Sequence, residues 1–83
     1  MKNPSFGAAA LTSLPQVDYS ELTVILPTLN EAGNVKPLSE EIFRQAPGSR
    51  IIVVDDSSDD DTGAVALSIH RLNPNLSLIE RRV

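Results

Sequence analysis

The sequence predicts an α/β fold in which three parallel strands alternate with two helices in the order β-α-β-α-β. Apolar runs rich in β-branched residues, over 22–27, 50–55 and 76–80, lack polar alternation, as is typical of strands buried on both faces of a parallel sheet. The two stretches between them carry apolar residues at helical spacing and are long enough to serve as crossovers. Because such crossovers are right-handed, we expect the strand order 3-2-1, one mononucleotide-binding half of a doubly wound sheet.

The first strand is predicted over Leu22–Pro27, because Pro27 has no N–H to donate to a strand ladder. A turn over Asn30–Asn34 follows. Asn34 is the predicted N-cap of the first helix, which places Pro37 in the first helical turn, where its missing N–H does no harm. The apolar face of this helix is formed by Val35, Leu38, Ile42 and Ala46.

The second strand is predicted over Arg50–Asp55 and the third over Leu76–Glu80. Between them, Asp59 or Asp60 is expected to cap a second helix, with acidic residues gathered at its positive N-terminal end. Asn73-Pro74-Asn75 ends this helix. Its apolar stripe consists of Val65, Ile69 and Leu72.

The charge of the chain is concentrated in one segment, since Asp55–Asp61 holds five of the eleven acids in a chain of net charge −4. No basic stripe exists, so we expect no nucleic-acid partner. The absence of cysteine excludes disulfides and thiolate metal sites and fits a reducing, cytoplasmic compartment. No apolar run approaches the roughly 20 residues needed to cross a bilayer.

The domain organisation is simple, because 83 residues allow at most one small domain. Residues 1–21 are rich in Ala, Ser and Pro without sustained periodicity and are predicted to form a flexible leader. Residues 22–83 then form one unit whose first strand has an unpaired edge, so we expect a truncated part of a longer protein. The exposed edge and thin core predict low stability or self-association through sheet edges or helix faces.

The residues best suited to bind a ligand follow the first two predicted strands. In open parallel sheets, ligands lie in the crevice beyond the carboxyl ends of the strands. Asn30 and Glu31 follow the first strand, and Asp55 and Asp56 end the second. Carboxylates at these positions can accept hydrogen bonds from a base N–H or from ribose hydroxyls, and Pro27 offers a rigid apolar edge for packing.

Other polar residues predict structural roles. The acids 59–61 are best explained as helix caps, so Asn in place of Asp60 is expected to serve equally well. His70, late in the second helix, is expected to be solvated. The acidic run is no calcium loop, because counting from Asp56 puts Leu67 where the bidentate acid belongs. No G-x-G-x-x-G and no G-x-x-x-x-G-K-[ST] occurs, which excludes the dinucleotide fingerprint and the P-loop.

The segments Val24–Glu31 and Val53–Thr62 resemble the two opening motifs of the inverting family 2 glycosyltransferases. Those motifs typically read Pro-Thr-x-Asn-Glu and Asp-Asp-x-Ser-x-Asp-x-Thr, and both are matched in full here. Within the family, the segments are most similar to those of the dolichyl- or polyprenyl-phosphate mannose and glucose synthases. The resemblance covers residues 22–83.

The resemblance implies a GT-A fold with a Rossmann-like nucleotide-binding sheet. It implies transfer of a hexose (mannose or glucose) from a GDP- or UDP-sugar to a polyprenyl or dolichyl phosphate or to another acceptor. It also implies a divalent metal, Mg or Mn, whose Asp-x-Asp ligands normally lie further along, as does the acceptor site. No catalytic residue and no metal ligand is therefore carried over. The family often has an aromatic residue where Leu29 stands. The residues implied to line the nucleoside pocket are Pro27, Leu29, Glu31, Val54, and Asp55 or Asp56.

Two other classes of function fit the sequence less well. A signalling receiver domain needs a later phosphoacceptor Asp and a lysine, but only Glu80 is acidic beyond Asp61 and no lysine lies beyond Lys36. A non-enzymatic interaction module would keep the half-sheet for packing only. The leading interpretation remains a glycosyltransferase segment that is inactive by itself, cytoplasmic or peripheral on the cytosolic face of a membrane.

Overall fold

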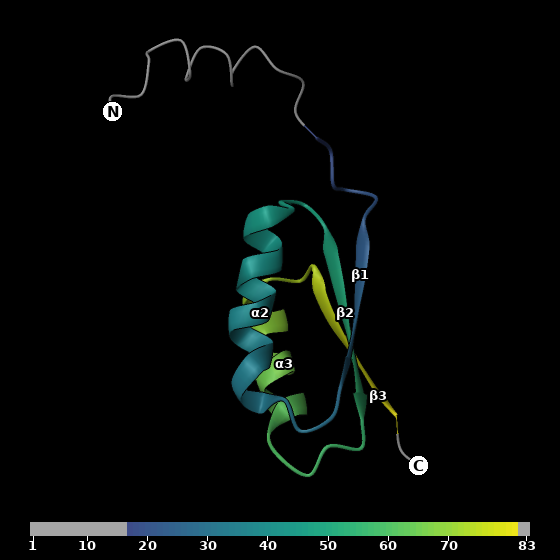
Figure 1. Ribbon diagram of the computed structural model, residues 1–83, viewed down its shortest axis with the longest axis vertical. Coiled ribbons are helices and arrows are strands. Elements are labelled where there is room, and N and C mark those ends of the chain that lie inside the picture. Colours follow the sequence, from purple (N-terminus) through teal and green to yellow (C-terminus); the bar gives the residue numbers. More distant parts are fainter. Residues whose placement is uncertain (1–16, 82–83) are drawn as a thin grey trace, which may run out of the picture.

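The computed structural model describes residues 17–81, which fold into a three-stranded sheet and two helices (Figure 1). Strand order is β1-β2-β3, and both neighbouring pairs are parallel. This confirms the predicted β-α-β-α-β order and the predicted neighbours. Of the leader expected over residues 1–21, residues 1–16 lie outside the described part of the chain. The elements are β1 (Thr23–Thr28), α2 (Ala32–Gln45), β2 (Arg50–Asp56), α3 (Thr62–Leu72) and β3 (Leu76–Arg81).

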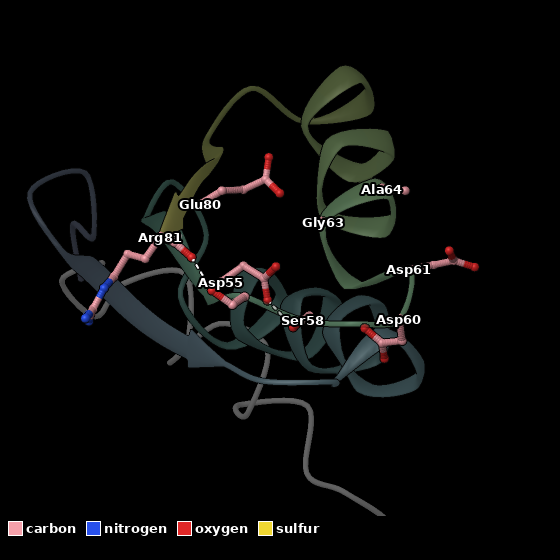
Figure 2. Close-up of a pocket in the computed structure, with 9 residues that line it drawn as sticks. Asp55, Ser58, Asp60, Asp61, Gly63, Ala64, Glu80 and Arg81 are labelled. Atoms are coloured by element: carbon pink, nitrogen blue, oxygen red, sulfur yellow. Dashed lines mark hydrogen bonds between the residues drawn. The ribbon is translucent and has the colours of Figure 1, made fainter. Parts of the chain in front are cut away.

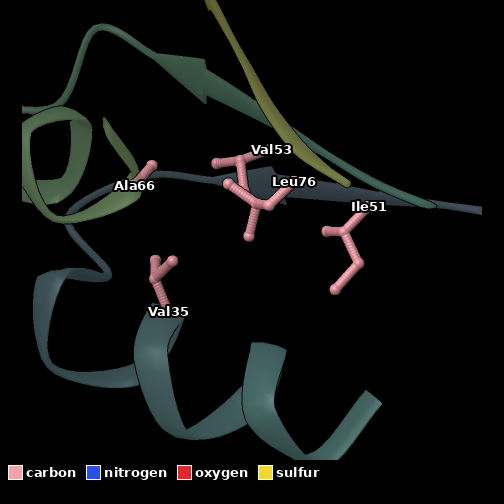
Figure 3. Packing of buried hydrophobic residues seen from close by; sticks show 5 residues of the cluster. All are labelled: Val35, Ile51, Val53, Ala66 and Leu76. Carbon is pink, nitrogen blue, oxygen red and sulfur yellow. The ribbon is translucent and has the colours of Figure 1, made fainter. Parts of the chain in front are cut away.

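The core lies between the sheet and the two helices, which cover the same face of the sheet (Figure 1). Ile51 and Val53 of β2 and Leu76 of β3 point from the sheet toward Val35 of α2 and Ala66 of α3 (Figure 3). All five side chains are buried. The central strand therefore supplies the middle of the core. Each helix contributes one buried residue to it and packs further, partly buried apolar side chains around it.

The opposite face of the sheet carries no helix, so the prediction that the strands are buried on both faces is wrong for the described part of the chain. Ile25 is 55% exposed and Ile79 is 51% exposed, while Ile52 and Val54 are half-buried. The physical reason is handedness, because two successive right-handed crossovers in the order β1-β2-β3 pass over the same side. We call the uncovered side the open face.

The start of α2 differs from the sequence prediction. Asn34 is not the N-cap, because the helix begins at Ala32 with Glu31 in the cap position. Asn34 instead donates from Nδ2 to Glu31 Oε2 at 2.7 Å. Pro37 consequently lies inside the helix and beyond its first turn. The earlier start is explained by a long-range contact, since the Ala32 N–H donates to Asp60 of the loop after β2.

The start of α3 agrees with the prediction only in part. Asp61 occupies the cap position without a side-chain capping bond, and the Asp60 carboxylate accepts the Thr62 N–H at 3.0 Å. Asp60 thus caps the helix from the residue before the cap position. His70 is exposed, as expected, and its Nδ1 lies 2.6 Å from the Leu76 carbonyl oxygen. Within residues 17–81, neither helix is long and apolar enough to span a membrane.

Candidate functional site

Two loops meet at the carboxyl edge of the sheet. The first loop, Leu29–Glu31, joins β1 to α2, and the second loop, Ser57–Asp61, joins β2 to α3. The strand register pairs Thr28 with Asp55, so the ends of β1 and β2 lie side by side. The predicted convergence of the two strand ends is therefore confirmed.

Asp55 binds the second loop through a hydrogen bond from Ser58. Asp55 is only 3% exposed, and its Oδ1 accepts a hydrogen bond from Thr28 Oγ1 at 3.1 Å. The same oxygen accepts a hydrogen bond from the Ser58 hydroxyl (Figure 2). A buried carboxylate is tolerated only where hydrogen bonds replace its water. Asp55 therefore holds the end of β1 and the second loop together.

The two loops are also joined to each other directly. The Asn30 N–H donates to Ser58 Oγ at 2.8 Å, and the Asp59 N–H donates back to Asn30 Oδ1 at 2.8 Å. The Glu31 N–H donates to Thr62 Oγ1 at 2.9 Å. Asn30 adopts a positive φ of 55°, a conformation that asparagine accepts more readily than most residues. The N–H groups of Asn30 and Glu31 are thus held by Ser58 of the second loop and by Thr62 at the start of α3.

Asp60 extends this network to the first backbone N–H of both helices. Its Oδ1 accepts from the Thr62 N–H at 3.0 Å and from the Thr62 hydroxyl, and its Oδ2 accepts from the Ala32 N–H at 3.1 Å. The hydrogen bond from the Thr62 hydroxyl, helped by those from the backbone N–H groups of Thr62 and Ala32, lowers the pKa of Asp60 below its ordinary value. The residue remains exposed to solvent.

Sequence reasoning missed this shared role of the motif residues. It treated the second-loop acids as local caps and regarded Asn30 as free for a ligand, whereas the structure uses these side chains to join the two loops. A signal was visible in the alternation of hydroxyl and carboxyl residues at every second position after the second strand. The side chains that take part are Thr28, Asn30, Asp55, Ser58, Asp60 and Thr62.

Three of the predicted nucleoside residues come together on the open face. Pro27 and Val54 are partners in the strand register, and Asp56 follows Val54 by two residues and so shares its face. Pro27 and Asp56 are exposed, and Val54 is half-buried. Asp56 Oδ1 lies 3.9 Å from Arg81 Nε of β3, an exposed ion pair that leaves the carboxylate accessible.

The other three predicted residues are placed differently. Asp55 lies on the helix-covered side of the sheet, away from Asp56. Leu29 is 59% exposed in the first loop. Glu31 is half-buried at the start of α2 and lines a cavity of about 110 Å³ together with Pro27 and Val35. Glu31 and Asp56 therefore approach the Pro27 edge from different sides.

A second cavity, of about 200 Å³, lies between the second loop, α3 and the end of β3 (Figure 2). The acids that line it are Asp55, Asp60, Asp61 and Glu80. Arg81 is the single cation of the lining, so the net negative charge of this cavity would repel a phosphate group. Gly63 keeps it open, because a Cβ at this position would approach Glu80 Oε2 to 3.0 Å. Over residues 17–81, no group of three or more His, Cys, Asp or Glu side chains is placed to hold a metal ion.

The fold and the site together define an α/β half-sheet whose first two strands end in joined polar loops, the architecture in which parallel sheets bind nucleotides. The family model described as Glycosyl transferase family 2 matches residues 23–83, well over half of the chain. The chain therefore belongs to glycosyl transferase family 2. The match begins at the first residue of β1 and includes both loops.

Proposed function

We propose that residues 22–83 are the nucleotide-recognition part of a glycosyltransferase and that the nucleoside of a GDP- or UDP-sugar binds at Pro27, Val54 and Asp56. One observation carries this proposal. Asp56 stands exposed beside an apolar pair at the carboxyl edge, and its ion pair with Arg81 is long at 3.9 Å. The motif side chains that join the two loops are instead engaged within the chain: Thr28, Asn30, Asp55, Ser58, Asp60 and Thr62. Membership of family 2 supports a nucleotide-sugar donor.

The chemistry of the three residues suits a base better than a phosphate. A carboxylate accepts hydrogen bonds, and both guanine and uracil present ring N–H donors. Pro27 and Val54 supply an apolar surface against which a flat ring can pack. A diphosphate would be repelled by the Asp56 charge. In this arrangement Asp55 supports the site and Asp56 contacts the nucleoside, while Leu29 and Glu31 border the Pro27 edge.

The finer assignment rests on the motif similarity. We propose transfer of a hexose, mannose or glucose, to a polyprenyl or dolichyl phosphate, which would place the protein at the cytosolic face of a membrane. A divalent metal, Mg or Mn, would stabilise the departing diphosphate. The described residues offer it no ligand set, so no step of the reaction is assigned to a metal held by them.

Binding of nucleotides by the chain tests this proposal. Calorimetric titration with GDP and with UDP should show binding to the wild-type protein. Asp56→Asn keeps the shape of the side chain but removes its charge, and should weaken binding by roughly 1–3 kcal/mol, about 5- to 150-fold.

Asp59→Asn is the matched control, because it makes the same charge change only three residues further along, at a residue that joins the loops through its backbone N–H alone. This variant should bind as the wild type does. Equal losses in the two variants would indicate a general charge effect and contradict a contact at Asp56. If neither nucleotide binds at millimolar concentration, the proposed function is overturned and an interaction module is favoured. The exposed apolar side chains of the open face support that alternative.

A further inference from the structure

The first N–H groups of the two helices converge on a single carboxylate. The initial N–H groups of a helix have no partner within the helix and need one from outside. Ala32 begins α2 and Thr62 begins α3, and the N–H of each donates to a different oxygen of Asp60. The sequence separates the two helix starts by a whole strand and helix, so this shared partner joins elements that are distant along the chain.

We propose that Asp60 is a positioning residue that sets the first loop against the second and thereby fixes Glu31 relative to Asp56. This inference rests on the nucleotide-binding function proposed above. Asp60 itself does not contact the nucleoside. It acts through the backbone of the first loop, which it holds at Ala32.

The hydrogen bonds around Asp60 form a closed ring. The Glu31 N–H donates to Thr62 Oγ1, the Thr62 hydroxyl donates to Asp60, and Asp60 accepts from Ala32, the residue after Glu31. Two consecutive N–H groups, of Glu31 in the first loop and of Ala32 at the start of α2, are thus held by the side chains of Thr62 and Asp60. Ser58 and Asn30 add a second connection a few residues earlier. The backbone that carries Glu31 therefore cannot shift without breaking several of these bonds.

The ring requires a carboxylate rather than an amide. Asp60 presents two acceptor oxygens, one for each helix start. Asparagine has a single acceptor oxygen, and its NH₂ group can only donate. An Asn side chain could keep the bond to Thr62 and would lose the bond to Ala32. The expectation that Asn at position 60 serves equally well took account of the cap of α3 alone and not of the bond to α2. The positive ends of two helix dipoles also favour a negative charge at this position.

The test combines nucleotide titrations with amide NMR spectra of the chain. Asp60→Asn should move the amide signal of Ala32 and weaken binding of the better nucleotide by about 3- to 10-fold, the effect of one or two lost hydrogen bonds. Asp60→Glu retains two acceptor oxygens and should recover much of the affinity. Asp59→Asn should resemble the wild type in both measurements.

A pH titration separates positioning from a general structural effect. Protonation of Asp60 removes a hydrogen-bond acceptor, so the Ala32 amide signal of the wild type should shift as Asp60 titrates. Because the pKa of Asp60 is lowered, this shift should occur at a pH below the ordinary aspartate pKa of about 4. The same transition should be present in Asp59→Asn and absent in Asp60→Asn. A general loss of structure would move signals throughout the sheet and would not remove one titration.

The outcomes are distinct. If Asp60→Asn binds nucleotide as tightly as the wild type, or if its Ala32 amide is unmoved, the positioning role is overturned. If Asp60→Asn does not fold, Asp60→Glu and the wild-type titration still decide whether the carboxylate holds Ala32. If the wild type binds no nucleotide, the proposed function fails, and the Ala32 titration alone supports or overturns the link between the helices.

Discussion

Asp55 and Asp56 are consecutive in the chain and lie on opposite sides of the sheet. Asp55 is buried beneath the helices and accepts hydrogen bonds from two hydroxyl groups, whereas Asp56 is exposed on the open face. The alternation of side chains along a strand produces this division. Two adjacent carboxylates thus differ in their surroundings because of direction alone: Asp55 holds the loops together, and Asp56 is the residue proposed to contact the nucleoside.

Substitutions at these two positions should therefore separate stability from binding. Asp55→Ala leaves the buried Thr28 hydroxyl without its carboxylate partner and should lower the free energy of unfolding by about 1.5–3 kcal/mol, the range for hydrogen bonds to a charged group. Asp56→Asn, on the exposed side, should change it by less than about 0.5 kcal/mol. Urea denaturation of both variants measures the difference. The division of roles is contradicted if Asp56→Asn is the more destabilising substitution.

The loop between α2 and β2 should depend on a glycine. Gly48 has a φ of +87°, a conformation that L side chains rarely adopt, although the space around it is empty. Gly48→Ala should therefore destabilise the protein by about 1 kcal/mol through backbone strain alone.

Gly33 provides the matched control for that substitution. It also has open space around it, but it lies in α2, where alanine is the better helix former. Gly33→Ala should stabilise the protein by about 0.5 kcal/mol. Thermal melts of the two variants should shift in opposite directions. A shift in the same direction would mean that strain at Gly48 is not the cause.

The open face should promote self-association. Ile25 and Ile79 expose apolar surface on the outer strands, and β1 pairs only with β2 among the described strands. We expect the mass measured by sedimentation to rise with concentration, and Ile25→Lys combined with Ile79→Lys to suppress this rise. Leu72→Lys is the control, because Leu72 is exposed on α3, on the other side of the sheet. If only this control prevented association, the helix side would be the interface.

The sequence by itself determined the order of the elements and the meeting of the two loops. Continuous apolar runs fix where strands form, and helical spacing between them fixes the crossovers. Because these crossovers are right-handed, the carboxyl ends of neighbouring strands are expected to lie side by side. The two motifs also resembled those of the glycosyltransferase family closely enough to suggest it, and the family model that matches residues 23–83 confirms this. These features are local in sequence or follow from general rules of topology.

Only the tertiary structure decided the partners of the polar residues. The start of α2 depends on Asp60, a residue beyond the next strand, and no local pattern near Asn34 records that contact. Likewise, strand alternation requires Asp55 and Asp56 to face opposite ways, but which of them is buried depends on the side that the helices cover. Hydrogen bonds between distant segments form after the chain has folded back on itself, and for that reason the roles of these acids could be read only from the folded structure.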